Sequence, residues 1–239
     1  TVIVNPLPSP TISGDLEICL GESTTLTTSG GMEYEWSTGE TTASITVSPS
    51  TNTTYMVMAK DINGCQDYTT VIVLVRPVPA AQISGDNVIC ISDSTSLLAS
   101  GGSSYLWSNG MTSASIKVSP IVNTDYVVTV SNIFGCFDTA SISVTVNPLP
   151  IAIITGNNSF CVGKSSLLTA SGGVSYEWST GAVTSSIMVN PGLNTTYTVT
   201  VTDVNGCTAT ASRMASVMSL PDVNINGEDQ ICEGSSVLL

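Results

Sequence analysis

The chain has 239 residues, of which 42% are apolar and only 10% are charged, and five basic residues against eighteen acidic ones give a net charge of -13. That balance would repel a phosphate backbone and an anionic lipid surface, so we expect no nucleic-acid partner. The longest apolar run, 71–75, is far too short to span a bilayer, so we expect no membrane insertion. The chain contains no histidine, which excludes Ser-His-Asp and Cys-His catalysis and histidine-ligated metal sites within it.

A fixed step of 71 residues organises the sequence. One cysteine series is Cys19, Cys90, Cys161 and Cys232, and a second is Cys65, Cys136 and Cys207. A constant period predicts tandem modules. In chain order we predict the last strand and linker of one repeat at 1–8, complete repeats at 9–79, 80–150 and 151–221, and the start of a fourth repeat at 222–239. Pro-x-Pro segments before each complete repeat predict stiff linkers and an extended rod.

The apolar period within a repeat is two, which predicts β-strands and no helix. In the third repeat the predicted strands are 165–171, 175–179, 186–189, 196–202 and 208–217, with an Asn-Gly turn between the last two. With a strand after the linker, about six or seven strands fit one repeat, which suits a small immunoglobulin-type sandwich. The predicted fold class is therefore all-β, a tandem array of Ig-like β-sandwich domains.

One tryptophan and one tyrosine in each repeat are predicted core residues. The tryptophans alternate in phase with an inward-facing tyrosine, at the place where a sandwich needs a large buried side chain. This phase favours a core position over the alternative of exposed platforms for sugar rings. The predicted core residues are Trp36, Trp107, Trp178, Tyr55, Tyr126 and Tyr197.

The cysteine pairing has two solutions. We expect each repeat to close its own loop, and a loop of 46 residues would stabilise a repeat by roughly 4 kcal/mol. In an antibody-like topology, however, the start of the second strand and the last hairpin lie at opposite ends, so bonds between neighbouring repeats are the alternative, such as Cys19 with Cys136. Either solution implies an oxidising compartment, and we expect an extracellular, cell-surface location. The expected pairs are Cys19 with Cys65, Cys90 with Cys136 and Cys161 with Cys207, which leaves Cys232 to a partner beyond the chain end.

No candidate catalytic or metal-binding group recurs in every repeat. Asp15 and Asp86 share a position, for example, but Asn157 occupies it in the third repeat. Calcium needs several oxygen ligands that converge on one point, whereas single short polar residues are typical of turns. We therefore expect no cofactor and no enzyme activity, with a calcium site as the alternative.

The repeats carry variants of five motifs in order: ICxGxSxxL, SGG, YxWSTG, SIxVxP and NTTYxVTVTDxNGC. This unit resembles, over the whole chain, the Ig-like and PKD-like repeats of very large surface proteins of Bacteroidota. Such repeats form stalks and filaments that carry adhesive tips or enzymes, commonly exported by the type IX secretion route. The short O-glycosylation motif of these bacteria is similar to 93–95 and 138–140, which makes Ser94 and Thr139 candidate acceptors.

The resemblance implies a structural or adhesive stalk segment of an extracellular protein that projects a distal tip. Its expected partners are the neighbouring repeats and identical chains in a filament, and the ligand of the tip is unknown. The alternatives are spacer modules in a secreted polysaccharide-degrading enzyme and a carbohydrate-binding module. Against the last alternative, aromatic residues make up only 5% of the chain.

Overall fold

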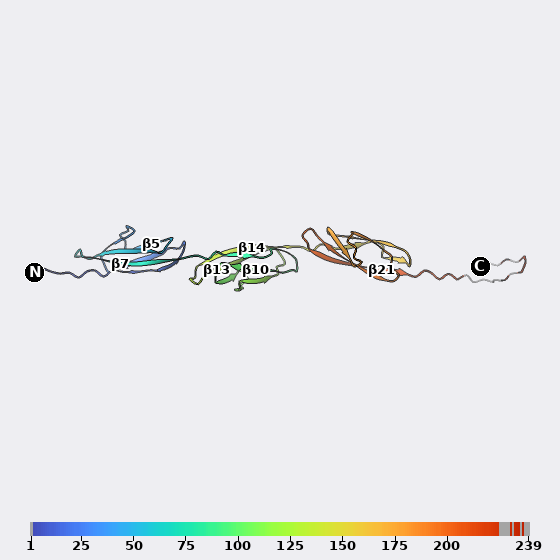
Figure 1. The fold of residues 1–239 in the computed structure, drawn as a ribbon, viewed down its shortest axis with the longest axis horizontal. Coiled ribbons are helices and arrows are strands. Elements are labelled where there is room, and N and C mark those ends of the chain that lie inside the picture. Colours follow the sequence, from blue (N-terminus) through green and yellow to red (C-terminus); the bar gives the residue numbers. More distant parts are fainter. Residues whose placement is uncertain (1, 225–229, 231, 235, 237–239) are drawn as a thin grey trace. The chain divides into compact units, whose positions relative to one another are not determined.

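The computed structural model describes residues 2–224, 230, 232–234 and 236, and every regular element in them is a β-strand (Figure 1). Strands recur with the 71-residue step, seven to a repeat. Those of the first repeat are β1 (Thr11–Ser13), β2 (Glu17–Cys19), β3 (Thr24–Ser29), β4 (Glu33–Trp36), β5 (Ser44–Val47), β6 (Thr53–Lys60) and β7 (Gln66–Arg76). Those of the second are β8 (Gln82–Ser84), β9 (Val88–Cys90), β10 (Thr95–Ser100), β11 (Ser104–Trp107), β12 (Ser115–Val118), β13 (Thr124–Ser131) and β14 (Phe137–Asn147).

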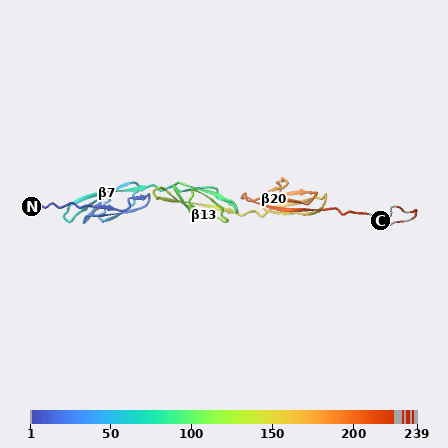
Figure 2. The ribbon, with the colours of Figure 1, turned by 90° about the horizontal axis from the view of Figure 1, so that it is seen from below.

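The third repeat tests the strand predictions directly. All five predicted strands are present and their ends agree within one residue, and two short strands precede them. These elements are β15 (Ile153–Thr155), β16 (Ser159–Cys161), β17 (Ser166–Ser171), β18 (Ser175–Trp178), β19 (Ser186–Val189), β20 (Thr195–Thr202) and β21 (Thr208–Met218). Figure 2 shows a long strand of each repeat, β7, β13 and β20, from a second direction.

Each repeat forms two sheets with the same strand order. In the first repeat a three-stranded sheet has the order β1-β3-β5 and a four-stranded sheet the order β2-β7-β6-β4. The short strand β2 pairs in parallel with β7, whereas β6 pairs antiparallel with both β4 and β7. Two packed sheets with these neighbours have the topology of an immunoglobulin-type sandwich. The predicted all-β fold class is confirmed.

The core of each sandwich lies between its two sheets. In the first repeat Leu26 from one sheet and Val57 and Val73 from the other are fully buried, and Trp36 is 2% exposed. Strand β3 alternates buried and exposed positions along its whole length, as the period of two requires. All six predicted core aromatics are buried, and each residue is at most 8% exposed.

The indole nitrogens of the tryptophans have repeated partners. Trp36 Nε1 donates to the carbonyl oxygen of Thr42 at 2.9 Å, and Trp107 and Trp178 make the same bond six residues ahead. Buried indole nitrogens require such an acceptor. The tryptophans therefore fix the loop after their own strand as well as filling the core, and they are not exposed platforms.

The chain divides into two compact units. One comprises Thr1–Asn87 and Ser94–Thr145, and the other comprises Val88–Asp93 and Val146–Leu239. The first unit thus contains all strands of the first repeat and most of the second repeat. The second unit contains the strands of the third repeat together with β9. The predicted start of a fourth repeat at 222–239 lies largely outside the described residues.

Candidate functional site

Strand β2 places Cys19 at one end of the first sandwich. Cys19 lies opposite Arg76 in the parallel pairing of β2 with β7, and Leu20 N donates to the carbonyl oxygen of Arg76 at 2.8 Å. Arg76 is the last residue of β7, whereas Cys65 directly precedes the first. Eleven residues of strand separate the two ends by about 36 Å, and a disulfide needs Cα atoms within roughly 7 Å.

The predicted pairing within repeats is therefore wrong. The disulfides are Cys19–Cys136 and Cys90–Cys207, each with a sequence separation of 117 residues and a Cα–Cα distance of 5.6 Å. Neither Cys19–Cys65, Cys90–Cys136 nor Cys161–Cys207 is formed. The bond between neighbouring repeats, weighed as the alternative, is the one that the structure contains. Cys65, Cys161 and Cys232 are free thiols.

A tight turn presents the second cysteine of each bond. Asn132 Oδ1 accepts from the backbone nitrogens of Phe134 at 3.0 Å and Cys136 at 3.1 Å, and Asn132 N donates to the carbonyl oxygen of Cys136. In the third repeat Asp203 and Cys207 repeat the arrangement. Asn132 and Asp203 thus stabilise turns, as is expected of short polar residues. Their side-chain oxygens face the turn's own backbone, where they accept hydrogen bonds.

Further contacts surround the Cys19–Cys136 bond within the first compact unit. Asn132 Nδ2 donates to the carbonyl oxygen of Pro77 in the linker at 2.7 Å. The Arg76 guanidinium lies 4.3 Å from the centroid of the Phe134 ring, and its Nε donates to Glu17 at 2.6 Å. An exposed cation–π contact contributes roughly 0.5–1 kcal/mol. At the junction between the first two repeats, the turn that ends at Cys136 is thus linked by a disulfide to the end of β2 and by a hydrogen bond to the linker.

Around the Cys90–Cys207 bond, in the second compact unit, the backbone hydrogen bond recurs but the side chains of Arg76 and Phe134 do not. Ile91 N donates to the carbonyl oxygen of Asn147 at 2.8 Å, as Leu20 does to Arg76. The Phe134 position is occupied by Asn205 and the Arg76 position by Asn147, so the cation–π contact cannot form. Sequence comparison between repeats misses Arg76 and Phe134 for this reason: neither residue recurs at the 71-residue step.

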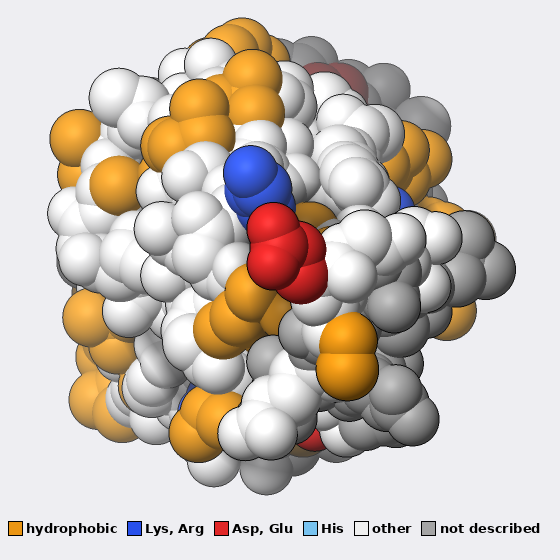
Figure 3. Space-filling view, turned by 90° about the vertical axis from the view of Figure 1, so that its right-hand side faces the viewer, with side chains coloured by type: hydrophobic (Ala, Val, Ile, Leu, Met, Phe, Trp, Pro, Cys, Tyr) orange, Lys and Arg blue, Asp and Glu red, His pale blue; other side chains and the backbone are white. Residues whose placement is uncertain are grey.

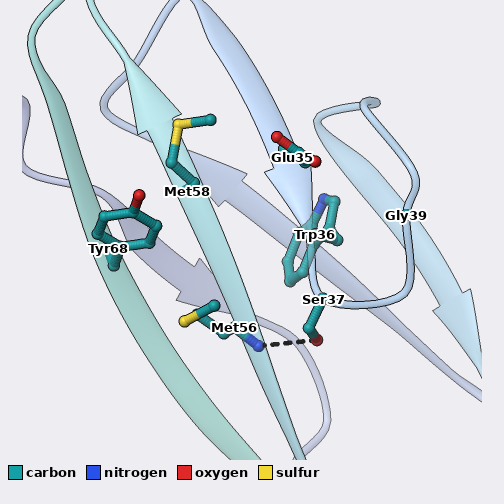
Figure 4. Close-up of a pocket in the computed structure, with 7 residues that line it drawn as sticks. All are labelled: Glu35, Trp36, Ser37, Gly39, Met56, Met58 and Tyr68. Carbon is teal, nitrogen blue, oxygen red and sulfur yellow. Dashed lines mark hydrogen bonds between the residues drawn. The ribbon is translucent and has the colours of Figure 1, made fainter.

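A shallow hollow of about 400 Å³ lies on the outer face of the first sandwich (Figure 4). Met56, Met58 and Tyr68 form its apolar side, and Met56 N donates to Ser37 Oγ at 3.2 Å. The corresponding residues of the third repeat are all threonine. The methionine and tyrosine lining therefore does not recur in the third repeat, and Glu35 is the single carboxylate among the lining residues. Its lining is Glu35, Trp36, Ser37, Gly39, Met56, Met58 and Tyr68.

Charged side chains are sparse on the face shown in Figure 3. Lys60 and Glu33 form an ion pair at 2.9 Å, and both side chains are exposed to solvent. Such a pair contributes little to stability. Among the described residues, no three Cys, Asp or Glu side chains lie together as metal ligands would. The same residues contain no helix of a length and apolarity that could cross a bilayer.

The candidate glycosylation acceptors both lie at the surface. Ser94 precedes β10, Thr139 lies within β14, and both side chains are exposed. An exposed hydroxyl is accessible to a modifying enzyme, so modification of these two residues stays a prediction.

No family model and no curated protein matches this sequence. Solved structures with similarity include a Ca²⁺-stabilized adhesin that helps an Antarctic bacterium reach out and bind ice, at 17% identity and a TM-score of 0.42 over 93% of this chain and 76% of that one. An I-band fragment of titin has 12% identity and a TM-score of 0.44 over 91% and 100%. A 1.5-MDa bacterial ice-binding adhesin has 13% identity and a TM-score of 0.34 over 90% and 99%. Similarity at this level carries no information about ligand or activity.

Proposed function

We propose that this chain is a structural, adhesive stalk segment of an extracellular cell-surface protein, built from Ig-like domains at 9–79, 80–150 and 151–221. The observation that carries the proposal is the disulfide between consecutive repeats. A domain that binds or catalyses alone gains nothing from a covalent bond to its neighbour. A stalk gains a second connection beside each linker, which resists bending and transmits tension.

Other properties of the chain support an extracellular stalk. Two disulfides require an oxidising compartment. The surface is rich in Thr and Ser and poor in charge, and no charged residue type recurs at one position in every repeat. Large surface proteins of Bacteroidota, exported by the type IX route, are the proposed class.

Small-angle X-ray scattering of the oxidised chain tests the proposal. A rod of three domains spans on the order of 100 Å and has a radius of gyration of roughly 30 Å, whereas a compact packing of the same length has about 18 Å. We expect the larger value for the oxidised chain. Double substitution of Cys136 and Cys207 by serine should give a broader distance distribution, because each junction then keeps only its linker. A compact value for the oxidised chain would overturn the stalk.

The carbohydrate-binding alternative is weaker because exposed aromatics do not recur between repeats. Tyr68 is 55% exposed, but its position holds Thr139 and Thr210 in the other repeats. Saturable binding to a glycan array that is lost in Tyr68→Ala would favour a carbohydrate-binding module over the stalk.

A further inference from the structure

A row of three side chains crosses the outer face of the four-stranded sheet in the first repeat. Glu35 of β4 lies opposite Met58 of β6, and Met58 lies opposite Tyr68 of β7. Residues directly opposite each other on antiparallel strands point to the same face, with Cβ atoms about 4.5–5.5 Å apart. The row therefore places a carboxylate, a thioether and a phenol ring beside one another at the hollow (Figure 4).

Glu35 and Met58 line two hollows on this face. One is the hollow of about 400 Å³ that Met56 and Tyr68 also line, and the other, of about 390 Å³, is also lined by Met32. Apolar groups are open to solvent here, since Tyr68 is 55% and Met56 41% exposed. Each hollow has the volume of a small-molecule site, which is roughly 300–1,000 Å³.

The charge of Glu35 has no counter-charge in the described part of the chain. Its neighbour Glu33 lies opposite Lys60 and forms an ion pair with it at 2.9 Å, whereas Glu35 lies opposite Met58. Covering a carboxylate with a neutral apolar ligand removes its hydration at a cost in free energy. A ligand with a positive charge avoids that cost, and the net charge of -13 attracts it from a distance.

The composition of the row favours an organic cation over a bare metal ion. Calcium needs several oxygen ligands that converge on one point, and Glu35 is the single carboxylate among the residues that line the larger hollow. An aromatic ring packs well against a thioether and another ring. Glu35 and Tyr68 are two strand spacings apart, about 10 Å, so a ligand that contacts both has its charge at one end and its ring at the other.

We propose that this hollow binds a small organic cation, with its ammonium group at Glu35 and its aryl ring against Met58 and Tyr68. The site goes beyond the proposed stalk function, because it gives one repeat of the stalk a ligand of its own. Binding is reversible and involves no covalent step.

The third repeat has the same backbone arrangement without the apolar side chains. Glu177 lies opposite Thr200, and Thr200 lies opposite Thr210. Thr198 N donates to Ser179 Oγ at 3.2 Å, as the equivalent nitrogen of the first repeat does. The carboxylate thus recurs on a surface of threonines, which makes the third repeat a control within the same molecule.

Methyl NMR of the full chain, labelled at methionine, tests the site. The probe is phenethylammonium, and phenethyl alcohol is its neutral counterpart. Phenethylammonium should shift the methyl signals of Met56 and Met58 saturably, and phenethyl alcohol should bind roughly two- to fivefold more weakly. Added salt should weaken the binding of the cation alone. The signals of the methionines that line neither hollow should stay unchanged, namely those of Met111, Met188, Met214 and Met218.

Single substitutions separate the charge from the ring. Glu35→Gln should weaken phenethylammonium binding roughly two- to fivefold, and Tyr68→Thr roughly two- to tenfold. Glu177→Gln, at the matched carboxylate, should leave the affinity unchanged. The proposal would be overturned by equal affinities of the two probes, by shifts of similar size at every methionine, by no shift at all, or by equal effects of Glu35→Gln and Glu177→Gln.

Transfer of the apolar side chains to the third repeat tests whether they are sufficient. A variant with Thr198→Met, Thr200→Met and Thr210→Tyr retains Glu177 and should acquire a second site. Its two introduced methyl signals should shift over the same range of phenethylammonium concentration as those of the first repeat. No shift of these signals would overturn the assignment of the site to this row. Failure of the binding leaves the scattering result for the stalk unaffected.

Discussion

The side-chain amide of Asn132 donates a 2.7 Å hydrogen bond to the carbonyl oxygen of Pro77. The same side chain accepts two backbone hydrogen bonds that shape the turn before Cys136. An amide performs both tasks because it has a donor and an acceptor. Asp203, at the same position of the third repeat, can only accept.

Asn132→Asp should separate these two tasks. The turn keeps its acceptor, but the bond to Pro77 is lost, at a cost of about 0.5–1.5 kcal/mol. We expect the Cys19–Cys136 disulfide to become roughly two- to tenfold easier to reduce in a glutathione titration followed by peptide mapping. The Cys90–Cys207 bond in the same sample is the control. An equal shift of both bonds would contradict a local effect.

Thiol titration distinguishes the two pairings without any substitution. The observed disulfides leave Cys65, Cys161 and Cys232 to react with a thiol reagent under denaturing conditions, whereas pairing within repeats would leave Cys232 alone. Cys136→Ser should add one reactive thiol, and peptide mapping of the labelled cysteines should identify it as Cys19. A label on Cys90 instead would show pairing within repeats.

Neighbouring leucines of β17 provide a matched test of the core. Leu168 is 0% exposed and Leu167 is 51% exposed. Leu168→Ala should destabilise the third repeat by about 3–5 kcal/mol, because it removes buried methyl groups and leaves a cavity, and Leu167→Ala by less than about 1 kcal/mol. Calorimetry of both variants checks this. Similar losses of unfolding free energy in the two variants would contradict the burial of Leu168 and the exposure of Leu167.

Substitution of Gly101 and of Gly110 by alanine distinguishes the cost of backbone strain from the cost of a steric collision. Both have positive φ, 107° and 84°, so alanine at either costs roughly 1–2 kcal/mol. A Cβ at Gly101 would also collide with the carbonyl oxygen of Ala80, the first residue of the second repeat, whereas at Gly110 it meets no heavy atom within 4 Å in the described part of the chain. Gly101→Ala should therefore lower the melting temperature of the second repeat more than Gly110→Ala does. Equal losses would show that the backbone at Ala80 moves aside freely.

Burial raises the pKa of the Tyr55 phenol above its usual value of 10.0. The unfolded chain then ionises first as the pH rises, so the stability of the first repeat is complete below pH 10 and declines above it. Tyr55→Phe removes this ionisation. Thermal unfolding of both proteins at neutral pH and at a pH above 10 should show the larger loss in the native chain. The same loss in both would assign the decline to other groups.

The long strands and the core were predictable because their signal extends over many residues. The alternation of Tyr197, Val199 and Val201 on one face of β20 needs no knowledge of the partner strand. The tryptophans were placed correctly for the same reason. Their acceptor carbonyls were not predicted, since a loop's conformation carries no such period.

The pairing of Cys19 could not be predicted from the same signals. Strand β2 has three residues, too few for alternation to show, and only its parallel pairing with β7 locates Cys19 at that end of the sandwich. Loop-closure entropy ranks pairs by sequence separation and ignores the length of the strand between them. Arg76 and Phe134 were missed because a comparison between repeats retains only what recurs.

The two disulfides overlap along the chain, because Cys90 lies between Cys19 and Cys136, and Cys136 lies between Cys90 and Cys207. A single cut of the backbone anywhere from Cys19 to Cys207 therefore leaves the two fragments covalently joined. A protease that nicks one exposed loop between these cysteines would not sever such a chain. Release of its distal part requires reduction, or three cuts that place Cys19, Cys90, Cys136 and Cys207 on four different fragments.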